Sequence, residues 1–159
     1  MVDASGTTKY TYTAGNELYT EDGPFTSDTV TNIYVNRLRT VLALQQPTGY
    51  WTNQFSWDAT RRLTNVTSSA GTFAYTLNAT APASPLIRQL ALPNGSKITN
   101  SYDSVARLSS TYLRNSSGTA LDSYVYVYDP ANERTNLTRT DASTVAYKYD
   151  AIGQLKVAG

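Results

Sequence analysis

The same seven-residue pattern returns several times along this chain of 159 residues. Segments 57–63, 102–108 and 149–155 each begin with an aromatic residue followed by Asp, and each ends with Leu after a turn-forming stretch and a long polar residue. Segment 128–134 keeps the aromatic residue and Asp but ends with Arg, whereas segment 12–18 lacks only the Asp. The average unit of about 23 residues is typical of solenoid repeats, in which each unit is stabilised by its neighbours.

Hairpin signals accompany these motifs. The chain contains 13 Tyr residues and many Thr residues, which favour strands, and short segments rich in Gly, Asn, Ser and Asp, which favour turns. The strongest turn signal is Asn94-Gly95, because both residues tolerate a positive φ. Four successive hairpins are predicted, from the strand pairs 62–67 and 72–77, 87–92 and 97–102, 108–114 and 121–128, and 134–140 and 144–149.

The first third of the chain follows the pattern less closely. Residues 10–12 and 18–20 predict another hairpin, whereas residues 30–44 are compatible with two strands or one helix. We favour strands because β-branched residues and the surrounding repeats outweigh a weak 3.6-residue period. We therefore predict a single all-β domain over residues 1–159, in which residues 1–50 are degenerate repeats or a cap and residues 51–159 are clear repeats.

The expected architecture is a set of stacked antiparallel β-hairpins that form a twisted strip or an open spiral, part of a shell-like or solenoid-like structure.

The composition of the chain limits which functions are possible. The chain has no Cys and no His, which excludes disulfides, zinc sites built from these residues, thiol nucleophiles and His-based triads. A net charge of +1 with 16% charged residues indicates no nucleic-acid partner. No apolar run reaches about 18 residues and no signal peptide is recognisable, so we expect no membrane insertion.

The segments Tyr102–Leu108, Tyr128–Thr138 and Tyr149–Leu155, with Leu92–Gly95, resemble the tyrosine-aspartate (YD) repeats of the RHS family. The consensus of these repeats is close to Tyr-Asp-x-x-Gly-Arg-Leu followed by a Thr-rich hairpin. The resemblance implies a β-strip that spirals into a hollow shell, as in bacterial polymorphic toxins, insecticidal toxin-complex components and animal teneurins. It also implies a secreted or cell-surface location. A complete shell needs many more units and no toxin domain is recognisable, so encapsulation is not transferred to this chain.

We assign structural roles to the repeated residues. Each aromatic residue is expected to stack on neighbouring units, with its polar atom reaching water or a carbonyl group. Each motif Asp is expected to accept backbone N–H groups of the following turn, and Arg62 and Arg107 to pair with such carboxylates between units. The structural motif residues are Tyr12, Trp57, Asp58, Tyr102, Asp103, Tyr128, Asp129, Tyr149 and Asp150.

The acidic residues could instead have a chemical role. A glycosidase needs a carboxylate pair, which two of the four motif Asp residues could supply, but a regular row of carboxylates is typical of a scaffold. Segment 21–23 and Asp141 do not match an EF-hand loop or a Gly- and Asp-rich calcium repeat. We therefore expect no catalytic residues, no metal site and no cofactor, and predict that the chain is not an enzyme.

Exposed aromatic residues are the better candidates for a ligand site. Tyr50, Trp51 and Trp57 lie near each other in the sequence with Asn53 and Gln54 between them, and an aromatic ring beside amide groups suits a sugar. The alternative is that both Trp side chains are core residues. We expect a structural module whose open strand edges pair with a second copy or with neighbouring repeats of a larger protein, unless residues 1–30 cap them. A glycan-binding adhesion module is the alternative.

Overall fold

The computed structural model describes residues 1–78 and 84–159, and every regular element in these ranges is a β-strand. No helix with the length and apolarity needed to cross a membrane occurs in them. The strands are β1 (Val2–Asp3), β2 (Gly6–Thr7), β3 (Lys9–Tyr12), β4 (Leu18–Asp22), β5 (Val30–Val35), β6 (Leu38–Gln46), β7 (Gly49–Trp57), β8 (Leu63–Ser68), β9 (Gly71–Leu77), β10 (Ile87–Ala91), β11 (Lys97–Tyr102), β12 (Leu108–Arg114), β13 (Ala120–Tyr128), β14 (Arg134–Arg139), β15 (Thr144–Tyr149) and β16 (Leu155–Ala158).

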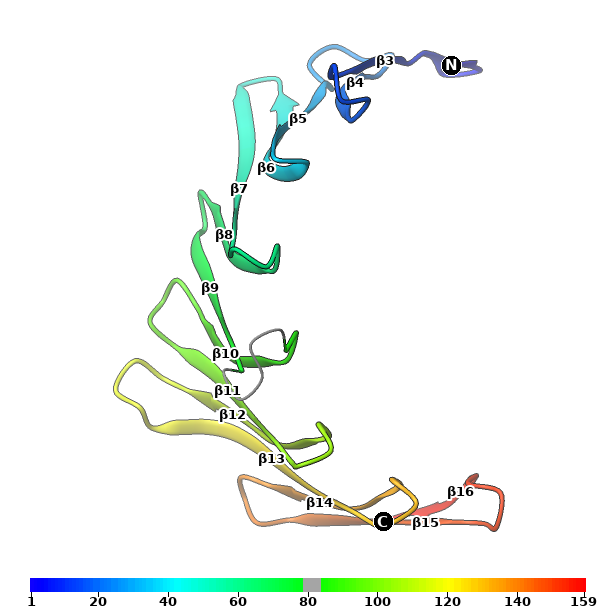
Figure 1. The fold of residues 1–159 in the computed structure, drawn as a ribbon, viewed down its shortest axis with the longest axis vertical. Coiled ribbons are helices and arrows are strands. Elements are labelled where there is room, and N and C mark those ends of the chain that lie inside the picture. Colours follow the sequence, from blue (N-terminus) through cyan, green and yellow to red (C-terminus); the bar gives the residue numbers. More distant parts are fainter. Residues whose placement is uncertain (79–83) are drawn as a thin grey trace. The chain divides into compact units, whose positions relative to one another are not determined.

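The strands pair with their neighbours in sequence. β1 and β2 form a small ladder of their own, and β3 to β16 follow one another in sequence order in an antiparallel sheet of 14 strands (Figure 1). The four predicted hairpins are confirmed, and residues 30–44 form β5 and most of β6, as favoured over a helix. The all-β class and the strip of hairpins are therefore confirmed.

The contacts between residues group into two compact units, Met1–Ala74 and Tyr75–Gly159. The first contains β1 to β8 and the second contains β10 to β16, while β9 spans the boundary between them. In the first unit, β4 to β7 each pair with the strand before and the strand after, and in the second unit β11 to β15 do the same (Figure 1). The prediction of a single domain stays a prediction.

The two faces of the second unit differ in composition. Along β15, half-buried Val145, Tyr147 and Tyr149 alternate with exposed residues, as the period of two in a strand requires. Val145 lies beside Leu137 of β14, which in turn lies beside Tyr126 of β13. We call this side the aromatic face; its members are Tyr124, Tyr126, Tyr128, Leu137, Val145, Tyr147 and Tyr149.

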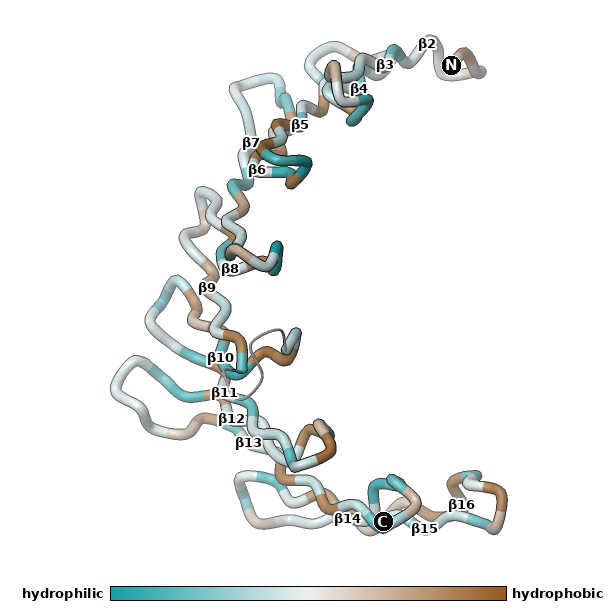
Figure 2. Tube along the Cα trace, in the orientation of Figure 1, coloured by the Kyte–Doolittle hydropathy of each residue, from teal (hydrophilic) through white to brown (hydrophobic). Residues whose placement is uncertain are grey.

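Burial in this fold is shallow. Leu137, which is 8% exposed, is the one buried hydrophobic side chain among the described residues, and no described side chain is completely enclosed. Apolar segments are short and are separated by polar ones along the coloured trace (Figure 2). Val127, on the side of β13 opposite the tyrosines, is 53% exposed, whereas Ser123 on that side is 8% exposed. Side chains on one face must therefore cover one another.

Candidate functional site

The motif Asp residues hold the turns that follow β7, β11, β13 and β15. Asp103 Oδ1 accepts the backbone N–H groups of Val105 at 3.0 Å and Arg107 at 2.9 Å. Equivalent bonds are made by Asp58 to Thr60 and Arg62, by Asp129 to Glu133, and by Asp150 to Ile152 and Gln154. The predicted turn role of these carboxylates is confirmed. Thr13 replaces Asp in the first motif, where its Oγ1 accepts the N–H groups of Gly15 and Glu17.

The motif aromatic residues join each sequence repeat to the repeat before it. The Tyr128 hydroxyl donates to the carbonyl oxygen of Leu108 at 2.9 Å, and the Tyr149 hydroxyl donates to that of Arg134 at 2.9 Å. Each of these two acceptors is the last residue of the previous motif and the first residue of the strand that begins there. Tyr102 and Trp57 make the matching bonds, to Ile87 O and Arg39 O respectively. The predicted reach to a carbonyl is confirmed for these four residues, whereas Tyr12 is 58% exposed.

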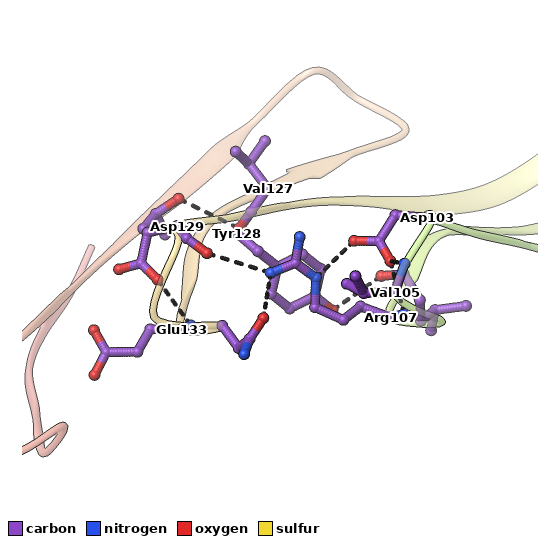
Figure 3. A network of polar contacts seen from close by, with 10 residues as sticks. Asp103, Val105, Arg107, Val127, Tyr128, Asp129 and Glu133 are labelled. Carbon is purple, nitrogen blue, oxygen red and sulfur yellow. Dashed lines mark hydrogen bonds and ion pairs between the residues drawn. The ribbon is translucent and has the colours of Figure 1, made fainter.

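Arg107 connects two consecutive motifs (Figure 3). Its Nε donates to Asp103 Oδ2 at 2.6 Å, and its Nη1 donates to Asp129 O at 3.2 Å and to Asn132 Oδ1 at 2.7 Å. The guanidinium also lies 4.7 Å from the centre of the Tyr128 ring, a cation–π distance. Arg107 therefore binds the turn that it belongs to and the turn of the following unit.

The ion pairs differ from the prediction in one respect. Arg62 and Arg107 pair with Asp58 and Asp103 of their own turns, four residues earlier, at 2.7 and 2.6 Å. The expected pairing between units is wrong, because the backbone of the turn brings the side chains of its first and fifth residues together. In the case of Arg107, the contacts between units go to a carbonyl and an amide oxygen instead.

These bonds stabilise the ionised form of two motif carboxylates. The Arg62 backbone N–H and the Thr60 hydroxyl hold the pKa of Asp58 well below its ordinary value of 3.8. Desolvation would raise the pKa of Asp103, but the bonds from the Arg107 side chain and from the N–H groups of Arg107 and Val105 lower it. Both carboxyl groups have a pKa below the ordinary value for Asp in the folded chain. They therefore stabilise the fold above about pH 4, and this stability is lost as the two carboxylates are protonated at lower pH.

A left-handed backbone residue occupies the same place in every motif turn. The φ angles at Asn16, Arg61, Ala106, Asn132 and Gly153 lie between 63° and 79°, four residues after the motif aromatic. The pairing shifts by one residue at the start of each of these turns, as in a type I turn closed by a bulge. Glycine is the residue best suited to this conformation, and only Gly153 supplies it.

Ala106→Gly is expected to raise the free energy of unfolding by about 1 kcal/mol, because alanine pays a steric penalty at a φ of 68° that glycine avoids. Gly153→Ala, at a φ of 79°, should have the opposite effect and serves as the matched control. Urea denaturation of both variants tests this prediction. A loss of stability in Ala106→Gly would contradict it.

The predicted ligand-binding residues are spread along β7. Tyr50 and Trp51 are 65% and 39% exposed, and neighbouring residues of a strand point to opposite sides. Trp57 lies on the same side as Trp51 but about 20 Å further along the strand, where its indole N–H is bonded to Arg39 O. A cavity of about 300 Å³ lies there, lined in part by Phe55 and Trp57. The three residues therefore do not form one site, and glycan binding stays a prediction.

The acidic residues do not gather into a metal site. No group of three or more Asp and Glu side chains placed to hold a metal ion occurs in the ranges that the structure describes. The motif carboxylates instead accept backbone N–H groups, each within its own turn. Their arrangement suits the closing of turns.

Sequence reasoning missed three features of these turns. It did not find the left-handed position, the bridge from Arg107 to the next unit, or Glu133, which stands where Arg62 and Arg107 stand in other motifs. Aligning the motifs at the fifth residue after the aromatic would have shown that this place is Arg in two motifs, Glu in two and Gln in one. The direction of the Arg107 side chain has no signal in a single sequence.

No family model matches the sequence, and no curated protein matches it. The chain in the crystal structure of TcdB2-TccC3 without its hypervariable C-terminal region covers 96% of this chain with a TM-score of 0.54 and 13% identity. The crystal structure of TcdB2-TccC3 covers 96% of this chain with a TM-score of 0.53 and 14% identity. The structure of the Photorhabdus luminescens Tc holotoxin pore covers 94% of it with a TM-score of 0.49 and 14% identity. These matches cover 10%, 11% and 10% of the solved chains.

The present chain thus spans about a tenth of the length of the solved chains that it resembles. The two TcdB2-TccC3 structures with TM-scores above one half share its antiparallel arrangement of hairpins over almost its whole length. The chain has the fold of these TcdB2-TccC3 chains, which confirms its resemblance to the RHS family at the level of the fold.

Proposed function

We propose that this chain is a structural segment of an RHS-like β-shell. The observation that carries the proposal is the repeated bond between units, in which a motif aromatic side chain donates to the backbone of the preceding unit. This bond uses no residue outside two adjacent units, so the same geometry can be extended by adding units. The fold shared with a tenth of a TcdB2-TccC3 chain supports a role as one part of a longer scaffold.

The proposal includes association through the outer strands. β3 and β16 are the first and last strands of the 14-stranded order, and all described side chains of both are exposed. Gly159 and Ala146 exchange both backbone hydrogen bonds, so the N–H of Ala158 faces away from β15. Such an unpaired edge is a template for another strand, from a second copy or from neighbouring repeats.

Ala158→Pro tests this association, because proline removes the outward N–H while leaving the bonds of Gly159 and Val157 to β15 in place. Light scattering coupled to size exclusion over a concentration series should show a mass that rises with concentration for the wild type. The rise should be weakened in Ala158→Pro and kept in Ala158→Val, which retains the N–H. A monomeric wild type at every concentration would contradict association.

We propose further that the chain is not catalytic and acts outside the cell or at its surface. The first part is supported by the engagement of the motif carboxylates with turn backbone, which leaves them a structural task. The second part rests on the resemblance to RHS proteins. A structural role of this kind requires the aromatic bonds between units to be maintained, and the variants at Tyr128 described below test that requirement directly.

A further inference from the structure

The motif turn that begins at Asp129 has an acidic residue where the two preceding motif turns have an arginine. In the turns that begin at Asp58 and Asp103, the fifth residue is Arg62 or Arg107, which forms an ion pair with the Asp. In the turn that begins at Asp129, the fifth residue is Glu133. Its backbone N–H still donates to Asp129 Oδ1 at 3.0 Å, so the turn keeps its shape although its side chain has the opposite charge.

The Glu133 side chain is directed toward the next turn. A Cβ atom built on Gly153 would lie 3.1 Å from Glu133 Oε1, and Gly153 is equivalent to Asn132 of the preceding turn. Arg107 reaches that preceding turn by donating to Asp129 O and Asn132 Oδ1. Figure 3 shows the Glu133 carboxylate directed away from Arg107. Glu133 therefore occupies the bridging place between two turns with a group that, when ionised, has no hydrogen to donate.

The charged groups around Glu133 act in the same direction. Asp129 faces it from its own turn and Asp150 from the next one, while Arg107 of the preceding turn is bound to Asp103 and to Asp129 O. Burial, the Asp129 charge and hydrogen bond, and the Asp150 charge all raise the pKa of Glu133 above its ordinary value of 4.5. Neighbouring like charges disfavour ionisation of Glu133 in the folded state.

We propose that Glu133 is an acid-operated latch between the turns that follow β13 and β15. Ionised, it is repelled by Asp129 and Asp150 and leaves this junction weak. Protonated, it can share its hydrogen with Asp129 and is no longer repelled by Asp150, so that its carboxyl group can stay packed against the next turn beside Gly153. The other motif turns differ at this place. Arg62 and Arg107 form ion pairs there, Gln154 is uncharged, and the Glu17 carboxylate accepts the Thr13 hydroxyl of its own turn.

The sign of the effect follows from linkage. A carboxyl group whose folded pKa is raised stabilises the fold fully below its unfolded value, here about 4.5, and this stability is lost as the pH rises through the folded pKa. The lowered pKa values of Asp58 and Asp103 act oppositely and below about 3.8. The latch should therefore tighten on going from pH 7 to about pH 4.5, before the other turns begin to lose their ion pairs.

Glu133→Gln is the test, since glutamine has nearly the same shape, carries no charge and donates a hydrogen bond at every pH. We expect its melting temperature to exceed that of the wild type at pH 7 and to equal it near pH 4.5. Glu21→Gln, which takes a carboxylate away from β4, is the matched control. Its melting temperature should not exceed that of the wild type at pH 7 and then match it at pH 4.5. A Glu133→Gln difference that is the same at both pH values would overturn the proposal.

A second measurement uses the unmodified chain. The Asp150 and Gly153 amides close the turn on the far side of the junction, donating to Gln154 O and Asp150 O. Their hydrogen-exchange protection factors, which correct for the intrinsic pH dependence of exchange, should rise severalfold from pH 7 to pH 4.5. Those of Asp103 and Ala106, in the turn held by Arg107, should not rise. Equal behaviour of the two turns would also overturn the proposal.

Discussion

Tyr128→Ala is expected to lower the free energy of unfolding by about 2–4 kcal/mol, which places it among the most damaging single changes in this chain. The variant loses the ring on which the Arg107 guanidinium stacks and the hydroxyl bond to Leu108 O. It also removes apolar area from the aromatic face, where no second layer of the described structure can move in to replace it. Denaturation with urea, followed by tyrosine and tryptophan fluorescence, measures the loss.

Two further variants separate the contributions of the ring and the hydroxyl. Tyr128→Phe keeps the ring and removes only the bond to Leu108 O, so its cost should be about 1 kcal/mol. Tyr50→Ala removes a tyrosine that is 65% exposed and should change stability by no more than about 0.5 kcal/mol. If Tyr128→Ala proved as mild as Tyr50→Ala, the aromatic residue would not be a joint between units.

Much of the fold follows from the sequence because its signals are local. A strand that ends in Tyr128, an Asp that closes the next turn and a period of two along β15 each depend on residues close in sequence. Copies of the motif then reinforce one another, so an ambiguous stretch such as residues 30–44 could be assigned by its surroundings. The topology could also be predicted, because each strand pairs with the next strand along the chain and only a short turn separates the two.

The contacts between consecutive repeats could not be predicted in the same way. The partner of Arg107 lies within its own turn, while its remaining donors reach Asp129 O and Asn132. Which of these an arginine selects depends on the twist between consecutive hairpins, and that twist is not encoded in a motif. For the same reason Trp51 and Trp57, six positions apart in the sequence, were grouped although an extended strand separates them.

The repeated turns explain how a fold with so little burial can be specified. Each turn satisfies its own backbone groups through Asp and a left-handed residue, and each aromatic side chain bonds the previous unit. The free energy of unfolding of such a chain is the sum of the stability of each repeat and of each interface between neighbouring repeats. A weak interface therefore lowers the stability of the two repeats that share it and leaves the others unchanged. Glu133 marks one such junction in the second unit, which is where a pH-dependent opening would begin.

Leu137→Ala is expected to destabilise the second unit by about 2–3 kcal/mol, near the lower end of the range for buried leucines. Leu137 is 8% exposed and lies beside Tyr126 of β13 and Val145 of β15, so its removal uncovers both neighbours on the aromatic face. The cost falls near the lower end because the gap opens toward solvent and neighbouring side chains can partly close it.

Thr144→Ala is the matched control for this variant. Thr144 is exposed at the start of β15, on the side opposite Val145, and its removal should cost no more than about 0.5 kcal/mol. Comparing hydrogen exchange in the two variants locates the effect. In Leu137→Ala, protection should fall in β13, β14 and β15 and be kept in β5 to β7, because contacts in a repeat fold reach only neighbouring units. A uniform loss of protection over the whole chain would instead show that the two units unfold together, and would contradict the description of stability as a sum of local terms.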